Sequence, residues 1–131
     1  MRLLIDTHTY LWFVKNSKEI TPLASSLIQD ERNQILISIA SLWEISIKTS
    51  RGRLVIDGGY ETVADDLKTN LIEIWPISFL HTVKQSRLPF HHKDPFDRMI
   101  AAQALVEKIN LVSVDDIFDR YFENSEVKRI W

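Results

Sequence analysis

Short apolar runs alternate with helix-like segments along this chain, and this alternation limits the possible folds more than any other feature. Each run is dominated by Leu, Ile and Val, as expected for a strand that is buried on both faces. The four runs that we interpret as strands are residues 3–5, 34–39, 71–75 and 111–114. Because a helical pattern follows each run, the chain is predicted to be an α/β protein with a central parallel sheet flanked by helices on both faces.

The segments between these runs carry recognisable helix-start signals. Thr21-Pro22 and Asp94-Pro95 each place a capping residue before a proline at the first helical position. Residues 88–93 (LPFHHK) form the one irregular connection of distinct composition. We expect helices over residues 7–15, from 22 onward, 41–51, 60–70, 78–87, 95–108 and 117–122, with a possible edge strand over 127–131. Without repeats or linkers, the 131 residues are predicted to form a single domain, 1–131, with four to five strands.

Composition excludes several classes of function. The chain has no cysteine, which removes disulfides, thiol catalysis and cysteine-based zinc sites. Its formal net charge of -2 argues against a generally basic nucleic-acid binder, so any nucleic-acid site must be local or bridged by metal. No apolar run approaches the ~18 residues of a membrane span, and Asp6 comes too early for a signal peptide. We therefore expect a cytoplasmic protein that makes no membrane contact.

Four acidic residues lie where a predicted strand ends or a predicted helix begins. Asp6 and Asp115 directly follow the first and fourth apolar runs, whereas Glu44 and Asp97 fall within about the first turn of helices. Loops that leave the carboxyl ends of parallel strands form the ligand cleft, so these four side chains should converge. Clustered carboxylates repel one another, and a divalent cation such as Mg²⁺ removes that cost. We predict that all four are metal ligands and catalytic residues, which activate a water molecule for attack on a phosphodiester.

Each acid also has an ordinary structural explanation. Ser41 and Glu44 match a capping box. Asp97 would be favoured by the dipole at the start of its helix, and Asp6 and Asp115 could cap the helices that follow them. If all four were caps, the chain would be a non-catalytic binding module that acts through a protein partner. Caps and metal ligands use the same residue types, so this alternative stays open.

An aspartyl-phosphate protein is a poorer interpretation. The usual phosphatase signature requires a second Asp two residues after the nucleophile, and this chain has His8 at that position. A receiver-type switch requires a phosphorylatable Asp on a central strand, but the second apolar run offers only Ser38.

Four segments together resemble a known family. LLIDTH, SLWEI, DPFDRMIAAQA and LVSVD, with Phe118 shortly after, look like the PIN domain, and most closely like the VapC-like toxins of type II toxin–antitoxin pairs. The likeness runs from Leu3 to Phe118, and DPFDRMIAAQA is its most specific part. Ser113 stands where many relatives carry Thr, and it keeps the hydroxyl.

The resemblance implies an endoribonuclease that depends on Mg²⁺ or Mn²⁺ and cleaves an RNA substrate. By the motif match, Asp6, Glu44 and Asp97 are the core acids and Asp115 is the fourth, more variable one. The family likeness also implies a homodimer and a cognate antitoxin, a segment of which covers the active-site groove.

Charged neighbours of the acids give further expectations. Arg98 could contact a substrate phosphate or pair with Asp94, and both options stay open. Lys48 is expected to form an ion pair with Glu44 one helical turn away. We interpret Asp94 and Asp116, which stand beside the core acids, as helix caps.

The histidines and tryptophans have ordinary interpretations. His91 and His92 are predicted to be surface-loop residues, although histidine can also act as an acid, base or ligand. Trp12 and Trp43 are expected to pack in the core or in an interface, and exposure of either would suit an antitoxin contact.

Overall fold

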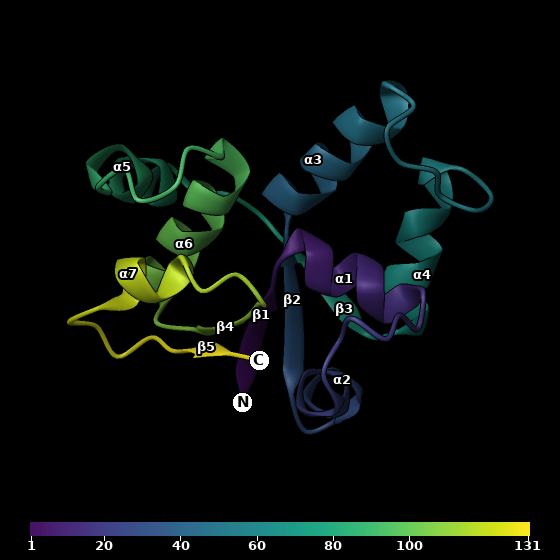
Figure 1. Ribbon diagram of the computed structural model, residues 1–131, viewed down its shortest axis with the longest axis horizontal. Coiled ribbons are helices and arrows are strands. Elements are labelled where there is room, and N and C mark those ends of the chain that lie inside the picture. Colours follow the sequence, from purple (N-terminus) through teal and green to yellow (C-terminus); the bar gives the residue numbers. More distant parts are fainter.

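The computed structural model describes all 131 residues and contains one sheet of five parallel strands (Figure 1). The strands are β1 (Arg2–Ile5), β2 (Gln34–Ser38), β3 (Ile72–Trp75), β4 (Asn110–Val112) and β5 (Arg129–Ile130). Their order across the sheet is β3-β2-β1-β4-β5, and every neighbouring pair is parallel. The predicted fold class is therefore confirmed, including the edge strand near the end of the chain.

Helices form the connections between the strands. They are α1 (Thr7–Val14), α2 (Pro22–Gln29), α3 (Ile39–Ser50), α4 (Val63–Thr69), α5 (Phe79–Arg87), α6 (Pro95–Glu107) and α7 (Phe118–Phe122). The helix expected over residues 60–70 begins with a separate 3-10 turn, η1 (Tyr60–Thr62), before α4. None of the helices is both long and apolar enough to cross a membrane.

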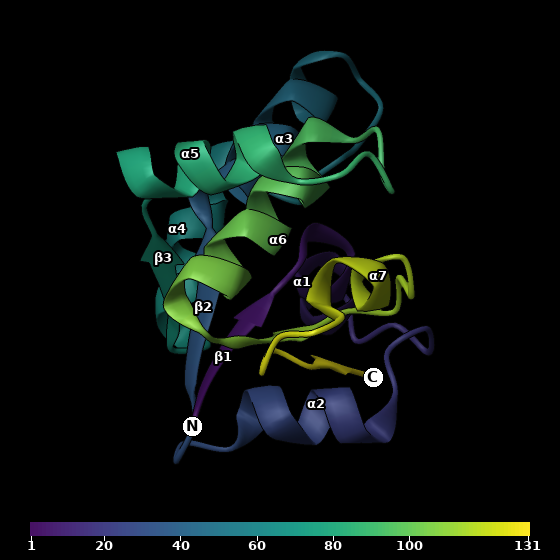
Figure 2. The same ribbon diagram turned by 90° about the vertical axis from the view of Figure 1, so that its left-hand side faces the viewer.

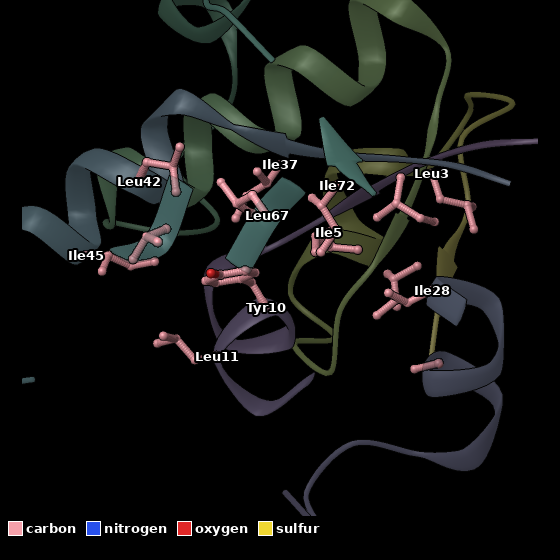
Figure 3. Packing of buried hydrophobic residues seen from close by; sticks show 14 residues of the cluster. Leu3, Ile5, Tyr10, Leu11, Ile28, Ile37, Leu42, Ile45, Leu67 and Ile72 are labelled. Carbon is pink, nitrogen blue, oxygen red and sulfur yellow. The ribbon is translucent and has the colours of Figure 1, made fainter. Parts of the chain in front are cut away.

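The strands place their side chains alternately on two hydrophobic clusters. Leu3 and Ile5 of β1 belong to the cluster beneath α1, α2 and α4, which Figure 3 shows from close by. Leu4 points to the other face and packs with residues of α6 and α7, such as Ile100 and Phe118. In Figure 2, α5, α6 and α7 lie on the near side of the sheet. Burial on both faces explains why the strands are continuous apolar runs.

Helix α3 begins at Ile39, two residues earlier than the sequence pattern predicted. Ser38 is the last residue of β2 and also the N-cap of α3, and its side chain accepts a hydrogen bond from the backbone N–H of Ala40. The capping box predicted for Ser41 and Glu44 is therefore wrong. Since the helix starts at Ile39, Glu44 lies in its second turn and is free of any capping role.

The chain changes direction across the sheet between β1 and β4. After β1 it builds β2 and β3 on one side, and after β4 it adds β5 on the other side. Loops that leave such neighbouring strands at their carboxyl ends diverge and open a crevice, which is where parallel α/β sheets bind their ligands. Asp6 and Asp115 follow these two strands, so the topology directs both of them to this crevice.

Candidate metal centre

Asp6 is anchored at the carboxyl end of β1. Its backbone is extended, and its Oδ1 accepts hydrogen bonds from the N–H and hydroxyl of Thr9, at 3.0 and 2.6 Å, so it caps α1 as the capping hypothesis expected. The Ser113 hydroxyl, at the end of β4, donates to Oδ2 at 2.6 Å. Only 3% of Asp6 is exposed, and this burial raises the pKa of its carboxyl group. Asp6 thus ties the two central strands together while holding an acid at the crevice.

The Glu44 side chain extends from α3 to the residue that follows Asp6. The hydroxyl of Thr7, the residue after Asp6, donates to Glu44 Oε1 at 2.7 Å. Lys48 Nζ lies 2.9 Å from Oε2, so the expected ion pair one helical turn away is confirmed. Both carboxylate oxygens are held by hydrogen-bond donors, and only 6% of the residue is exposed.

Asp97 stands in the first turn of α6, where its carboxylate is surrounded by other acids. Asp94 caps this helix by accepting the backbone N–H groups of Phe96 and Asp97. The Asp97 carboxylate itself accepts no backbone N–H. Burial, followed by the negative charges of four neighbouring acids, raises the pKa of Asp97 to about 8 from an ordinary value of 3.8. Those four neighbours are Asp94, Asp6, Glu44 and Asp115.

Asp115 lies beyond the end of β4 and is more exposed than the other three. Its Oδ1 accepts the backbone N–H of Ile117 at 3.1 Å, just before α7, as the capping hypothesis expected. The hydroxyl of Ser113 receives the backbone N–H of Asp115, which links this acid to Asp6 through one side chain. Asp97 is therefore the acid that connects the four selected from the sequence, because the charges of Asp6, Glu44 and Asp115 all act on it.

His92 belongs to this cluster, although the sequence pattern predicted a surface-loop residue. Its Nε2 lies 3.0 Å from Asp97 Oδ2 and 3.4 Å from Asp115 Oδ2. The side chain is 24% exposed, so it forms part of the wall of the site. The only signal in the sequence was its nearness to Asp94 and Asp97, which does not determine the path of an irregular loop.

Arg98 does not occupy the position expected of a phosphate ligand. Only 2% of it is exposed, and its guanidinium donates to the backbone carbonyls of Gln85, Leu88 and Pro89. It forms no ion pair with Asp94. Both expectations for Arg98 are therefore wrong, because its guanidinium is buried and binds the backbone between α5 and α6.

A family model and solved structures both match the chain. The model for the PIN domain matches residues 3–123. The chain belongs to the PIN domain family. No curated protein matched the chain.

The structural matches of this PIN domain cover nearly complete chains. VapBC2 from Rickettsia felis, bound to a DNA fragment of its promoter, gives a TM-score of 0.72 at 18% identity and covers 100% of both chains. DNA-bound VapBC from Salmonella typhimurium gives 0.69 at 14% identity and covers 99% and 97%. VapBC-5 from Mycobacterium tuberculosis gives 0.66 at 17% identity, with 98% and 97% covered. At these identities the matches establish a common fold.

The donor atoms of this PIN domain suit a hard divalent cation. Carboxylate oxygens are the ligands that Mg²⁺ and Mn²⁺ prefer, and there is no thiolate to attract softer metals. A carboxylate oxygen of Asp97 and one of Asp115 lie within 4.8 Å of each other, and a ring nitrogen of His92 lies within the same distance of both. The raised pKa of Asp97 indicates negative charge that the chain leaves uncompensated, and a bound cation would supply that compensation.

The acids lie outside the main cavities of the molecule. The largest cavity, about 410 Å³, lies near the opposite edge of the sheet and is lined by residues such as Phe13, Asn33 and Asn70. Small-molecule sites are usually deep, mostly apolar pockets. The four acids are therefore not part of a deep apolar pocket of that kind.

Two hydroxyl residues beside Asp6 also belong to the site, and the sequence analysis did not identify them. Thr7 orients Glu44, and Thr9 holds Asp6. Ser113, noted for its hydroxyl, bonds to Asp6. Such donors fix the direction of ligating carboxylates in metal sites. Two threonines that follow a strand-end acid, one and three residues later, are the signal that could have indicated them.

Proposed function

We propose that this protein is a metal-dependent endoribonuclease, the toxin of a toxin–antitoxin pair. In this proposal Asp6, Glu44, Asp97 and Asp115 hold Mg²⁺, or alternatively Mn²⁺, and the substrate is a phosphodiester bond of RNA. Membership of the PIN family and the matches to VapBC structures support this assignment.

The strongest support comes from the acids that capping does not explain. Asp6 and Asp115 accept backbone N–H groups near helix starts, so each has a structural use. Glu44 and Asp97 accept none, yet Glu44 bonds to the residue next to Asp6, and the charges of Asp6, Glu44 and Asp115 all raise the pKa of Asp97. A pure binding module would have no reason to place an uncompensated carboxylate beside three others. This observation favours the nuclease over the non-catalytic alternative.

The residues of the chain divide the work of the proposed reaction. A bound divalent cation would neutralise charge on the phosphate and make a water molecule more acidic. The four acids would hold that cation, and the hydroxyls of Thr7, Thr9 and Ser113 would keep Glu44 and Asp6 in place. Water would then attack phosphorus and lose a proton to solvent as the new P–O bond forms, the bond to the leaving sugar oxygen would break, and that oxygen would take up a proton from solvent. The chain needs no protein nucleophile, in keeping with its lack of cysteine.

The test is cleavage of a mixed pool of structured RNAs by purified protein, with Mg²⁺ or with EDTA. We expect discrete cuts that require the cation and that disappear in Asp97→Asn. Asp116→Asn is the matched control, because Asp116 is an exposed carboxylate next to Asp115, and this variant should cut like the wild type. Absence of cutting by folded, inhibitor-free protein would favour the binding module instead.

The proposed partners follow from the same assignment. We propose a cognate antitoxin, in keeping with the VapBC complexes that share the fold, together with a homodimer and a cytoplasmic location. Trp43 lies one residue before Glu44 with 62% of its surface exposed, and its ring contacts Phe96 edge-on at 5.5 Å. An exposed tryptophan that packs on a half-buried phenylalanine beside the acids would suit an antitoxin segment that covers the site. Light scattering of the purified chain would test the dimer, since a monomer mass would contradict it.

A further inference from the structure

The loop between α5 and α6 brings one imidazole into the acidic cluster. His92 Nε2 lies within hydrogen-bonding distance of two carboxylate oxygens, Asp97 Oδ2 at 3.0 Å and Asp115 Oδ2 at 3.4 Å. By distance alone, this nitrogen could be either a third metal ligand or a hydrogen-bond donor to the two acids. The two roles require opposite protonation of Nε2, because a ligand needs a lone pair and a donor needs a proton.

The other ring nitrogen decides between these roles. The backbone N–H of Asp94 donates to His92 Nδ1 at 3.1 Å. A backbone amide is always a donor, so Nδ1 must carry the lone pair and the proton of the neutral ring must be on Nε2. The proton on Nε2 therefore lies beside the two carboxylates, at the distances given above. For Nε2 to bind a metal, a proton would have to sit on Nδ1, directly against the amide proton of Asp94.

The main chain of His92 is held as firmly as its ring. Its backbone N–H donates to the hydroxyl of Tyr121 at 2.8 Å, and that hydroxyl also receives Arg98 Nη1 at 3.3 Å. Arg98 in turn binds three backbone carbonyls of the preceding segment. Arg98 and Tyr121 of α7 thus hold the main chain of the loop in place, and the backbone amide of Asp94 fixes the orientation of the His92 ring.

We propose that His92 is a positioning residue of the metal centre, which donates from Nε2 to Asp97 and Asp115 and does not itself bind the metal. The inference rests on the proposed function, since it assigns a role toward the same cation. In this proposal Nε2–H holds Asp97 Oδ2, 3.0 Å away, and leaves Oδ1 for the cation. Without the imidazole, the Asp97 side chain could rotate freely. Binding of the cation would then have to order this side chain, and the entropy lost would weaken the affinity for the metal.

The first test measures Mn²⁺ affinity in the absence of RNA, by calorimetry or by the signal of free Mn²⁺. We expect His92→Ala to weaken binding by about 10-fold or more, the usual effect of losing a residue that orients a ligand. His92→Gln, whose amide N–H can reach the position of Nε2, should stay within about threefold of the wild type. His91→Ala is the matched control, since the ring of His91 packs on Tyr121 and touches no acid.

The second test asks whether nitrogen coordinates the ion. In the pulsed electron paramagnetic resonance spectrum of the Mn²⁺-loaded protein, we expect no coupling from a directly bound imidazole nitrogen. A coupling that disappears in His92→Ala would make His92 a ligand and overturn the proposal. Equal affinity of the wild type and His92→Ala would also overturn it, while Asp97-dependent binding would leave the proposed function standing. If the wild type binds no Mn²⁺, or if Asp97→Asn binds it equally well, both the proposed function and this inference fail.

Discussion

Asp30 and Asp97 are the same residue type in opposite electrostatic situations. Asp30 follows α2, where the guanidinium of Arg32 donates to both of its oxygens at 2.8 and 3.0 Å and lowers its pKa to about 2. Asp97 lies at the carboxyl edge of the sheet, where burial and four acidic neighbours raise its pKa to about 8. The chain provides the first acid with its own cation and gathers carboxylates around the second.

This difference separates a surface ion pair from a site prepared for a ligand. A local pair two residues apart needs nothing from the rest of the fold, and it contributes little because both side chains meet water. The cluster around Asp97 is unfavourable by itself, and its members come from four separate segments of the chain. Such an arrangement is characteristic of functional sites, where side chains needed for binding or catalysis lower the stability of the fold.

The largest expected difference between the two acids is in activity. Asp97→Asn should lower Mg²⁺-dependent RNA cleavage by more than about 100-fold, because it removes a proposed ligand of the cation. Asp30→Asn should leave the initial rate unchanged. Rates on one labelled RNA under identical metal concentrations check both. Equal loss in the two variants would mean that the carboxyl edge has no special role.

Cation binding should stabilise the protein through Asp97 and not through Asp30. At a Mg²⁺ concentration 100 times the Kd, the wild type should gain about 2.7 kcal/mol, a rise of roughly 10 °C in Tm for a chain of this size. Asp30→Asn should keep this gain, and Asp97→Asn should lose most of it. Thermal melts with Mg²⁺ and with EDTA measure the effect. If Mg²⁺ raised the Tm of Asp97→Asn as much as that of the wild type, Asp97 would not be a ligand of the cation.

Without metal, the pH dependence of stability should reveal the raised pKa of Asp97. An acid with a raised pKa contributes fully to stability below its unfolded value of 3.8, and the contribution is lost as pH rises toward about 8. In EDTA, Asp97→Asn should therefore match the wild type near pH 3.5 and exceed it above pH 8 by several kcal/mol, at about 1.4 kcal/mol for each unit of the raised pKa. Urea unfolding across this range tests the sign, and a variant less stable at high pH would contradict it.

The hydroxyl that holds Glu44 should contribute to stability more than an exposed one does. Thr7→Val removes the 2.7 Å hydrogen bond to a buried carboxylate, and we expect a loss of about 1.5 kcal/mol. Thr82→Val is the control, since its hydroxyl bonds only to the exposed carbonyl of Phe79, and it should change stability by less than about 0.5 kcal/mol. Chemical denaturation measures both variants. Equal losses in the free energy of unfolding would show that the hydrogen bond to Glu44 contributes no more than an exposed one.

The smallest effect is expected when one charge beside Asp97 is removed and the fold is kept. Asn caps helices as well as Asp does, so Asp94→Asn should preserve the start of α6. Asp94 is the acidic neighbour that most raises the pKa of Asp97, so this variant should lower that pKa. Nuclear magnetic resonance titration of the side-chain carboxyl carbons measures the change. A pKa of Asp97 that stays in place would mean that burial alone accounts for its raised value.

The strands could be predicted because their burial is symmetrical. Leu3, Leu4 and Ile5 are all fully buried, since helices cover both faces of the sheet, and the run is therefore continuous in the sequence. Helix starts that combine a capping residue with a proline at the first helical position could also be predicted, as at Asp94-Pro95. The start of α3 was not, because Ser38 and Ser41 are the same residue type. Pairing of β2 with β3 extends to Ser38 opposite Trp75, and this tertiary contact fixes where the strand ends.

The sequence by itself determined the alternation of strands and helices and the four acids at their junctions, because both depend on local spacing. Only the tertiary structure decided what surrounds each acid. Ser113 reaches Asp6 across 107 positions of sequence, and Thr7 reaches Glu44 across 37. The path of the irregular loop between α5 and α6 places His92 beside Asp97 and lets its backbone carbonyls bind Arg98. Contacts of this kind depend on packing between distant segments, and no local pattern of residues records them.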